Sequence, residues 1–393
     1  MYHPLPRIEI DLAKLTANAR LVVDMCRACG ISVLGVTKAC AGSLQVAQAM
    51  LAGGVEMVAD SRLENLARLR SSGISPLLQL RLPMISRVDE CVTIADISLN
   101  SEPTVIAALG EAAHRLGRAH GVVLMVDLGD RREGVAPDDA VELALQAAET
   151  RGIEFLGFGT NLTCFGGIIP TRRNLGQLVE IAERFRARSG HPVQVVSGGN
   201  SSSLPLVMEG EVPAGVNQLR VGEGILLGRE TIGRSVLPGA YQDVFSLVGE
   251  VIECLEKPSL PCGEVGEDAF GCVPEFSDRG HRWRAIVALG RQDVLVEGLE
   301  PADPGMEILG ASSDHLIIDV TEAEQRPHVG EEVRLRIVDY AALLTAMTSP
   351  YVTKCYVGEE TGYRLDLWSR LPEVSVFEHR DRGPDAASAD YRA

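Results

Sequence analysis

The sequence has no apolar run long enough to span a membrane, and its first seven residues contain two prolines but no apolar segment of a secretory signal. We therefore expect a soluble protein located in the cytoplasm. Positive charge is also scarce, because 37 Lys and Arg stand against 54 Asp and Glu, for a formal net charge of −17. Since phosphate groups are bound by clustered Lys and Arg, nucleic acid is disfavoured as a partner, and no membrane partner is expected.

Cysteine pairs at metal-binding spacing are missing as well. Nine cysteines, an odd number, are scattered along the chain, and this usage favours reduced thiols over a disulfide framework. Cys26-x-x-Cys29 is the closest pair, but it lies in a helical pattern without a second pair at zinc spacing. We interpret this pair as part of helix packing and predict no metal site.

The first part of the chain alternates continuous apolar runs with helical patterns. Such runs are typical of parallel strands that are buried on both faces. Eight of these units predict an α/β fold with an N-terminal (β/α)8 TIM barrel, although an open doubly wound sheet would give the same pattern. Strands are expected at 32–36, 55–59, 76–80, 94–99, 121–127, 153–159, 193–196 and 218–221, and helices at 12–26, 44–51, 63–69, 103–116, 137–148 and 175–185.

The texture of the sequence changes near residue 236. Helical periodicity disappears, and short alternating segments appear between Pro and Gly, as in antiparallel sheets. We predict three parts: a barrel at 1–235, a C-terminal mainly β domain at 236–375, and a mobile polar tail at 376–393.

Residues that follow the apolar runs are the candidates for chemistry, because barrel active sites lie at the carboxyl ends of the strands. Lys38 follows the first run, just before a turn of small residues. An apolar setting lowers the pKa of a lysine and makes its amine available for Schiff-base chemistry. A lysine whose tip simply reaches solvent is the alternative. The loop 127–134, after the fifth run, is either an arginine clamp for an anionic oxygen or a solvated loop of mixed charge.

Two further loops suggest a phosphate site. The loops 197–203 and 220–224 follow the seventh and eighth runs and combine Gly with hydroxyls and backbone N–H groups, the usual phosphate cradle of a barrel. A lysine facing a phosphate site suggests pyridoxal 5'-phosphate, whose ring nitrogen also needs a partner. Arg220 is the candidate for this partner. An arginine should leave the nitrogen unprotonated, and the weaker electron sink favours return of a proton to Cα over decarboxylation or transamination.

Several motifs, taken together and in this order, resemble the alanine racemase family of fold-type-III pyridoxal-phosphate enzymes. They are RIEIDL at 7–12, VTKA at 36–39, DLGDRREG at 127–134, NSS at 200–202, RVG at 220–222 and ILGASSDH at 308–315. The resemblance covers nearly the whole chain. Four segments are similar to the ornithine racemase branch of this family: GFGTNL at 157–162, GEVGEDAFG at 263–271, GRQD at 290–293 and SSDH at 312–315.

The resemblance implies roles for individual residues around the cofactor. Lys38 would hold pyridoxal phosphate and act as the base on one face of the substrate Cα. Arg132 would bind the cofactor phenolate oxygen and approach the substrate carboxylate, and Asn161 would lie beside the ring, where alanine racemases usually carry a histidine. The remaining cofactor-binding residues implied are Asn200, Ser201, Gly222 and Glu223 near the phosphate, Arg220 at the pyridine nitrogen and Tyr351 as a hydroxyl donor to the phosphate.

The second domain would complete the site of another subunit in a head-to-tail homodimer. Asp314 would belong to the carboxylate site of the amino-acid substrate, and Arg291 either orients that carboxylate or pairs with Asp293. The family's tyrosine base for the opposite face has no counterpart in 263–271. Inversion of a stereocentre needs a proton donor opposite the acceptor, and we predict Asp268 for this role. The alternatives are binding of a cationic side chain by Asp268, and Cys262, Cys272 or His315 as the base.

The resemblance therefore implies a pyridoxal-phosphate-dependent amino-acid racemase, acting on ornithine or a similar basic amino acid. Racemases of alanine or another amino acid, and fold-type-III decarboxylases of basic amino acids, are the alternative enzymes. Arg220 counts against a decarboxylase, because that group carries an acid at this position. A cofactor-carrier protein would lack a second domain, and a class I aldolase would give Arg220 and Asp314 no role.

Overall fold

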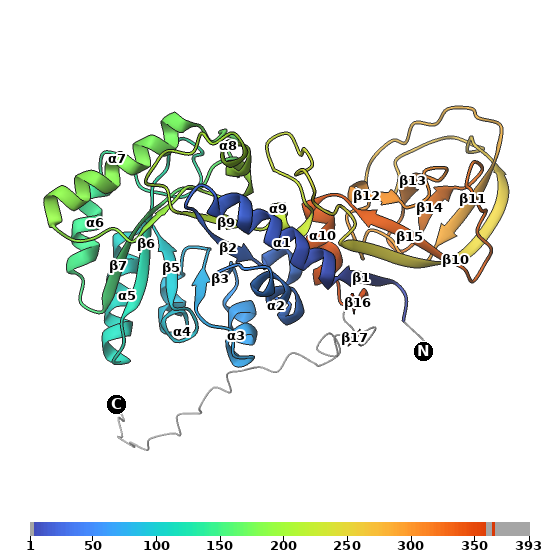
Figure 1. The fold of residues 1–393 in the computed structure, drawn as a ribbon. Coiled ribbons are helices and arrows are strands. Elements are labelled where there is room, and N and C mark those ends of the chain that lie inside the picture. Colours follow the sequence, from blue (N-terminus) through green and yellow to red (C-terminus); the bar gives the residue numbers. More distant parts are fainter. Residues whose placement is uncertain (1–3, 359–363, 366–393) are drawn as a thin grey trace, which may run out of the picture.

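The computed structural model describes residues 4–358 and 364–365, which form a barrel and a second, mainly antiparallel β domain (Figure 1). The predicted tail at 376–393 lies outside the described residues. In Figure 1 the barrel occupies the left of the molecule and the β domain the right, with α1 and α10 between them.

Eight parallel strands close the barrel in sequence order, which confirms the predicted (β/α)8 fold. The predicted runs coincide with these strands, with shifts of a few residues at the ends. Barrel strands have both faces covered, so continuous apolar runs were the correct signal. The strands are β2 (Ser32–Val36), β3 (Met57–Asp60), β4 (Leu77–Gln79), β5 (Ile97–Asn100), β6 (His120–Met125), β7 (Ile153–Gly159), β8 (Val195–Ser197) and β9 (Gln218–Val221).

Helices surround the barrel, and alternate strand residues pack inward or against them. Val36, Leu99 and Met125 belong to the inner cluster, whereas Val58 and Leu77 pack outward under the helices. The helices are α1 (Leu12–Arg27), α2 (Leu44–Ala52), α3 (Leu63–Ser71), α4 (Val88–Ile94), α5 (Pro103–Arg115), α6 (Ala140–Glu149), α7 (Arg172–Ser189), α8 (Leu204–Met208) and α9 (Glu223–Leu226).

Helix caps explain where two of the longer helices begin. The carboxylate of Asp11 accepts the N–H of Lys14 at the start of α1. Thr171 and Asn174 form a reciprocal capping box at the start of α7. Cys26 lies on the buried face of α1, as predicted for helix packing, whereas Cys29 is exposed just beyond the end of the helix and does not take part in that packing.

Within the described residues, the second domain contains a sheet of nine strands. It includes β1 (Arg7–Asp11), which lies in the segment that we assigned to the barrel. β1 pairs with β10 and β16 because the barrel is already closed by β2 to β9. The other strands are β10 (Phe245–Pro258), β11 (His281–Val287), β12 (Leu299–Pro301), β13 (Glu307–Ala311), β14 (Leu316–Asp319), β15 (Glu332–Ile337), β16 (Thr353–Val357) and β17 (Arg364–Leu365).

One helix of the second domain is important for the site. α10 (Tyr340–Thr348) begins after Asp339, whose carboxylate accepts the N–H groups of Ala341 and Ala342. The helix packs on η1 (Lys38–Cys40), the turn that follows β2. The second domain therefore reaches the carboxyl end of the barrel within the same chain.

Candidate active site

Lys38 begins the η1 turn directly after β2 and points into the mouth of the barrel. The hydroxyl of Thr37 donates to the buried carboxylate of Asp60 at 2.8 Å, which ties this turn to the end of β3. Lys38 is accessible to solvent from the open side of the barrel mouth, but many protein atoms lie around its amine and partly desolvate it. This burial lowers the pKa of Lys38, and nearby Arg132 lowers it further, while Cys164, Asp60 and Glu133 act in the opposite direction.

Arg220 projects from β9 into the top of the barrel and is only 3% exposed. Its guanidinium donates to the hydroxyl of Ser197, to the carbonyl of Thr160 at 2.6 Å and to the side-chain oxygen of Asn161 at 2.8 Å. Gly159 lies beside it, and a Cβ there would be in van der Waals contact with Nη1 of Arg220, at 3.5 Å. Burial lowers the pKa of Arg220 to about 10, so the guanidinium is still charged at neutral pH.

Arg132, Glu133 and Asn161 form one hydrogen-bonded group beside these two cations. Nε and Nη2 of Arg132 donate to the two carboxylate oxygens of Glu133. Nδ2 of Asn161 donates to Oε1 of Glu133 at 2.6 Å. Burial raises the pKa of Glu133, but the hydrogen bonds from Arg132 and Asn161 outweigh burial and hold it below its usual value.

The predicted phosphate loops meet at one side of the mouth. The hydroxyl of Ser201, in η3 (Ser201–Ser203), accepts the N–H of Gly224 at 3.1 Å and so joins the two loops. Space here is tight, because a Cβ on Gly222 would lie 3.2 Å from Cβ of Val36. As first residue of α9, Glu223 directs its backbone N–H out of the helix without an intrahelical partner.

Asn200 and the side chain of Glu223 make other contacts. Oδ1 of Asn200 accepts the N–H of Ser202 at 2.8 Å, and Nδ2 donates to the carbonyl of Leu162 at 3.0 Å. These bonds indicate that Asn200 shapes the loop. The carboxylate of Glu223 pairs with Arg234 at 2.8 Å. Because a carboxylate repels an anion, we expect only the backbone N–H of Glu223 to bind the phosphate.

Tyr340 is a site residue that the sequence analysis missed. Its ring centroid lies 5.9 Å from Nζ of Lys38, and its pKa is raised by burial. Tyr351, for which we predicted a phosphate contact, is 63% exposed at the other end of α10, about 13 Å of helix away. The structure brings Tyr340 to Lys38 and leaves Tyr351 outside this group.

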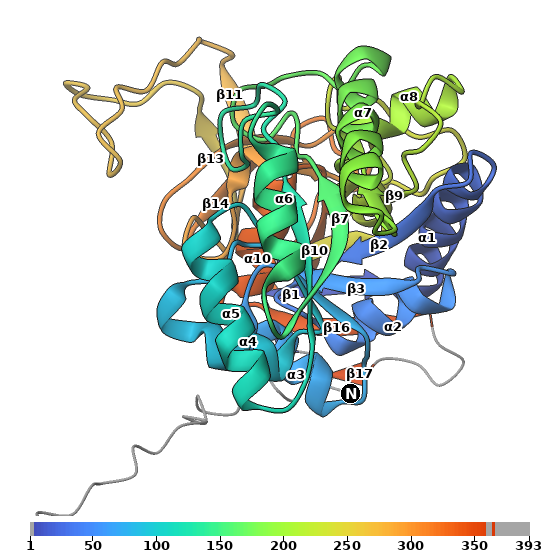
Figure 2. The same cartoon turned by 90° about the vertical axis from the view of Figure 1, so that its left-hand side faces the viewer.

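The predicted residues of the second domain do not join the barrel mouth of their own chain. Asp268 lies in the exposed connection 259–280 between β10 and β11, which projects beyond the rest of the molecule in Figure 2. Its carboxylate accepts the N–H groups of Phe270 at 2.8 Å and Cys272 at 2.9 Å, and these bonds lower its pKa. Cys262 and Cys272 are exposed in the same connection.

Arg291 and Asp314 lie near this connection. Arg291 pairs with Glu297 at 2.6 Å rather than with Asp293, and its guanidinium lies 4.9 Å from the ring centroid of Phe270. Asp314 is exposed and accepts hydrogen bonds from Ser313 and from Nδ1 of His315 at 3.0 Å. These residues therefore form an open surface with one cation and several carboxylates.

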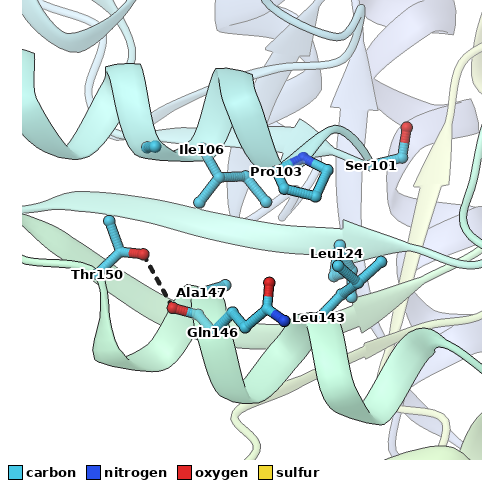
Figure 3. Close-up of a pocket in the computed structure, with 9 residues that line it drawn as sticks. Ser101, Pro103, Ile106, Leu124, Leu143, Gln146, Ala147 and Thr150 are labelled. Carbon is cyan, nitrogen blue, oxygen red and sulfur yellow. Dashed lines mark hydrogen bonds between the residues drawn. The ribbon is translucent and has the colours of Figure 1, made fainter.

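A cavity elsewhere on the barrel contains none of the predicted residues (Figure 3). It lies between α5 and α6 in the layer between the strands and the helices, and one lining residue, Ser101, directly follows the carboxyl end of β5. Its polar groups include Thr150, whose hydroxyl donates to the carbonyl of Gln146 at 2.9 Å. The lining also includes Ser101, Pro103, Ile106, Leu124, Leu143 and Ala147. We interpret this cavity as a gap in helix packing.

Membrane-spanning helices and metal-binding clusters are two further features to consider in the part of the chain that the structure describes. Within residues 4–358 and 364–365, no helix is both long and apolar enough to cross a bilayer. In the same part of the chain, His, Cys, Asp and Glu side chains nowhere gather in groups of three or more that could hold a metal ion.

The overall architecture is shared with solved enzymes of low sequence identity. An alanine racemase from a D-cycloserine-producing Streptomyces lavendulae aligns with a TM-score of 0.71 at 17% identity, over 91% of this chain and 98% of that one. The D-threonine aldolase from Filomicrobium marinum aligns with a TM-score of 0.68 at 16% identity, over 92% and 94%. At this identity the likeness concerns the fold alone.

Two proteins are much more similar to this chain in sequence. The ornithine racemase of Acetoanaerobium sticklandii is 43% identical over 350 residues, which cover 89% of this chain and 99% of the relative. The lysine racemase of Thermotoga maritima is 43% identical over 352 residues, covering 89% and 98%. The family description "Alanine racemase, N-terminal domain" matches residues 10–229, more than half of the chain. This chain is therefore a member of the alanine racemase family.

Proposed function

We propose that this protein is a pyridoxal-phosphate-dependent racemase that interconverts the L and D forms of ornithine or a similar basic amino acid. The observation that carries the proposal is the group at the barrel mouth, where Lys38 has a lowered pKa beside a buried arginine and two joined Ser/Gly loops. The 43% identity to an ornithine racemase and to a lysine racemase, each over nearly its full length, supports the same substrate class.

The side chains at the mouth fit pyridoxal phosphate. Lys38 offers the amine for the aldehyde, and Ser201 with the N–H groups of Gly222 and Glu223 would receive the phosphate. Arg220 would face the ring nitrogen, with Asn161 beside the ring and Arg132 at the phenolate oxygen. The hydroxyl of Tyr340, rather than that of Tyr351, is the better placed to approach the cofactor, since its ring contacts Lys38.

Pyridoxal phosphate, when bound, supplies an electron sink that stabilises negative charge at the substrate Cα. Lys38 would take the Cα proton on one face, because its lowered pKa increases the share of neutral amine. Arg220 stays charged, so it would donate a hydrogen bond to the ring nitrogen and leave that nitrogen unprotonated. This favours return of the proton to Cα over loss of CO2, and it counts against the decarboxylase alternative.

The opposite face needs a second proton carrier. We propose Asp268 of a second copy, because the N–H groups of Phe270 and Cys272 hold its carboxylate in one orientation in an exposed turn that a second copy can reach. Exposed apolar side chains support a head-to-tail homodimer: Phe165 is 75% exposed at the barrel rim, and Phe270 and Phe276 are exposed in 259–280. Arg291 and Asp314 would approach the substrate carboxylate from the same copy. A cytoplasmic location is part of this proposal.

The experiment is an exchange assay with the purified chain and added pyridoxal phosphate. In D2O, L-ornithine and L-lysine should lose optical rotation and gain deuterium at Cα without release of CO2, while L-alanine reacts more slowly. Chiral analysis of an amino-acid panel identifies the preferred substrate. Release of CO2 would favour the decarboxylase, and a protein that takes up no cofactor would refute the proposal.

A further inference from the structure

The side chain of Glu133 is a partly buried charge that the function above does not use. It lies in the loop after β6, which folds back because Gly134 has a φ of +128° and a Cβ there would lie 2.4 Å from the backbone nitrogen of Asp127. The fold-back is fixed by bonds from the N–H of Val135 to Met125 at 2.9 Å and from the N–H of Asp127 to Val135 at 3.0 Å. Glu133 is therefore presented to the barrel mouth by backbone geometry rather than by a flexible loop.

Glu133 connects Arg132, its neighbour in the loop after β6, with Arg220 on β9. On one side, its carboxylate takes both Nε and Nη2 of Arg132, so this edge of the guanidinium is occupied. On the other side, it accepts Nδ2 of Asn161, which turns Oδ1 of that amide toward Nη2 of Arg220. The result is a chain of contacts in the order Arg132, Glu133, Asn161 and Arg220.

The charge of Glu133 matters as much as its geometry. Arg132, Arg220 and Lys38 bring positive charge to one small region, and Glu133 interacts favourably with all three. Its side chain is 15% exposed, so solvent screens these interactions only in part. Removing the charge would leave two arginines less constrained and more strongly repelled by each other.

We propose that Glu133 is a positioning residue that holds Arg132 and, through Asn161, Arg220 in fixed orientations around the cofactor ring. This inference rests on the proposed function, because the two arginines are taken to face pyridoxal phosphate. Nη1 of Arg132 lies outside the bidentate pair and would be the nitrogen available to the ligand. Glu133 itself touches neither substrate nor cofactor.

The test measures binding of pyridoxal phosphate and the spectrum of the bound cofactor in Glu133→Gln. Loss of a charge-assisted pair should weaken cofactor affinity about tenfold, or about 1.4 kcal/mol, and shift the visible band. Glu64→Gln is the matched control, because Glu64 also pairs with an arginine, Arg87, at 2.5 Å but on the outer helices. The control should bind the cofactor like the wild type.

A second background separates positioning from general structural damage. Because Glu133 acts on both Arg132 and Arg220, Glu133→Gln should lower affinity less in an Arg132→Ala chain than in the wild type, and the remaining loss should arise through Asn161 and Arg220. Equal losses of affinity in both backgrounds, or an unchanged affinity and spectrum in Glu133→Gln, would overturn the inference. A wild-type protein that binds no pyridoxal phosphate would instead refute the proposed function, so the two failures are distinguishable.

Discussion

The barrel mouth and the connection 259–280 carry the two halves of the proposed chemistry, and they are built very differently. At the mouth, Arg220 is 3% exposed, and its guanidinium donates hydrogen bonds to residues at the carboxyl ends of two strands, β7 and β8. In the connection, Asp268 is exposed and its carboxylate is held only by backbone N–H groups of its own turn. The residues of the barrel mouth are held together by contacts within one chain, whereas the connection 259–280 is an exposed surface of that chain.

This difference suggests that the two regions have separate tasks, with the cofactor bound at the mouth and the second proton carrier supplied by the connection. Preorganised charges can hold a cofactor ring without help from another subunit, because the dipoles and hydrogen bonds are fixed in advance. A proton carrier for the opposite face has to approach from outside the mouth. The exposed connection with its apolar side chains is suited to that approach in a second copy, and the difference predicts distinct behaviour of variants in the two regions.

The largest effect is expected at the mouth for Lys38→Ala. Without the amine, the visible absorption of the bound cofactor should disappear, and racemisation should fall by about a thousandfold or more. Lys14→Ala is the control, because Lys14 is a lysine that pairs with Asp243 on the surface of the molecule. Absorption spectra and rates of both variants check this prediction, and a coloured, active Lys38→Ala protein would contradict it.

The next effect tests whether the other half comes from a second copy. Asp268→Asn alone should lower the racemisation rate by about a hundredfold while retaining the cofactor, as for loss of a general base. Mixed with Lys38→Ala under conditions that allow subunit exchange, it should recover about a quarter of the wild-type activity, because half of the dimers then contain one intact site.

Recovery requires that each site combine Lys38 of one chain with Asp268 of the other. Analytical ultracentrifugation of the wild type measures whether a dimer forms. If the mixture stays inactive although mixed dimers form, Asp268 is not the partner residue, and Asp314 and His315 become the residues to test.

The same contrast explains which parts could be read from the sequence. Lys38 follows the first apolar run and Arg220 lies near the end of the eighth. Their place at the mouth therefore follows from the order of the strands, because the carboxyl ends of all barrel strands meet there. Tyr340 was missed because it comes from α10, some 300 residues after Lys38 in the chain, and long-range packing leaves no local pattern. Glu133 next to Arg132 has the appearance of a solvated charged loop, and only the fold-back at Gly134 shows that it is partly buried.

A smaller effect should distinguish the two tyrosines. Tyr340→Phe removes a hydroxyl near Lys38 and should reduce cofactor affinity or turnover about fivefold, the value of about one hydrogen bond. Tyr351→Phe should behave like the wild type, since that side chain is 63% exposed at the far end of α10. Titration of both variants with pyridoxal phosphate checks this, and a larger loss in Tyr351→Phe would restore the original assignment.

The smallest effect on activity is expected for the ion pairs that tie β1 to the second sheet, although they matter for stability. Glu9 is buried and bonds to Arg7 and to Arg334 of β15. Burial raises the pKa of Glu9, but these two partners outweigh burial and hold it below its usual value of 4.5. A lowered folded-state pKa stabilises the fold above the unfolded-state pKa, and this stability is lost as pH falls through the folded value.

Glu9→Gln should therefore destabilise the protein at pH 7 by about 1 kcal/mol, because Arg7 and Arg334 lose the buried carboxylate that they share, while Arg7 keeps its pair with Glu332. It should also weaken the fall of Tm below about pH 4.5. Glu300→Gln is the control, since Glu300 pairs with Arg336 in the same sheet but on the surface. Thermal unfolding across pH measures both variants. The cofactor spectrum of folded Glu9→Gln should match the wild type, because β1 belongs to the second sheet and the barrel closes without it; a changed spectrum would mean that the two regions are coupled through β1.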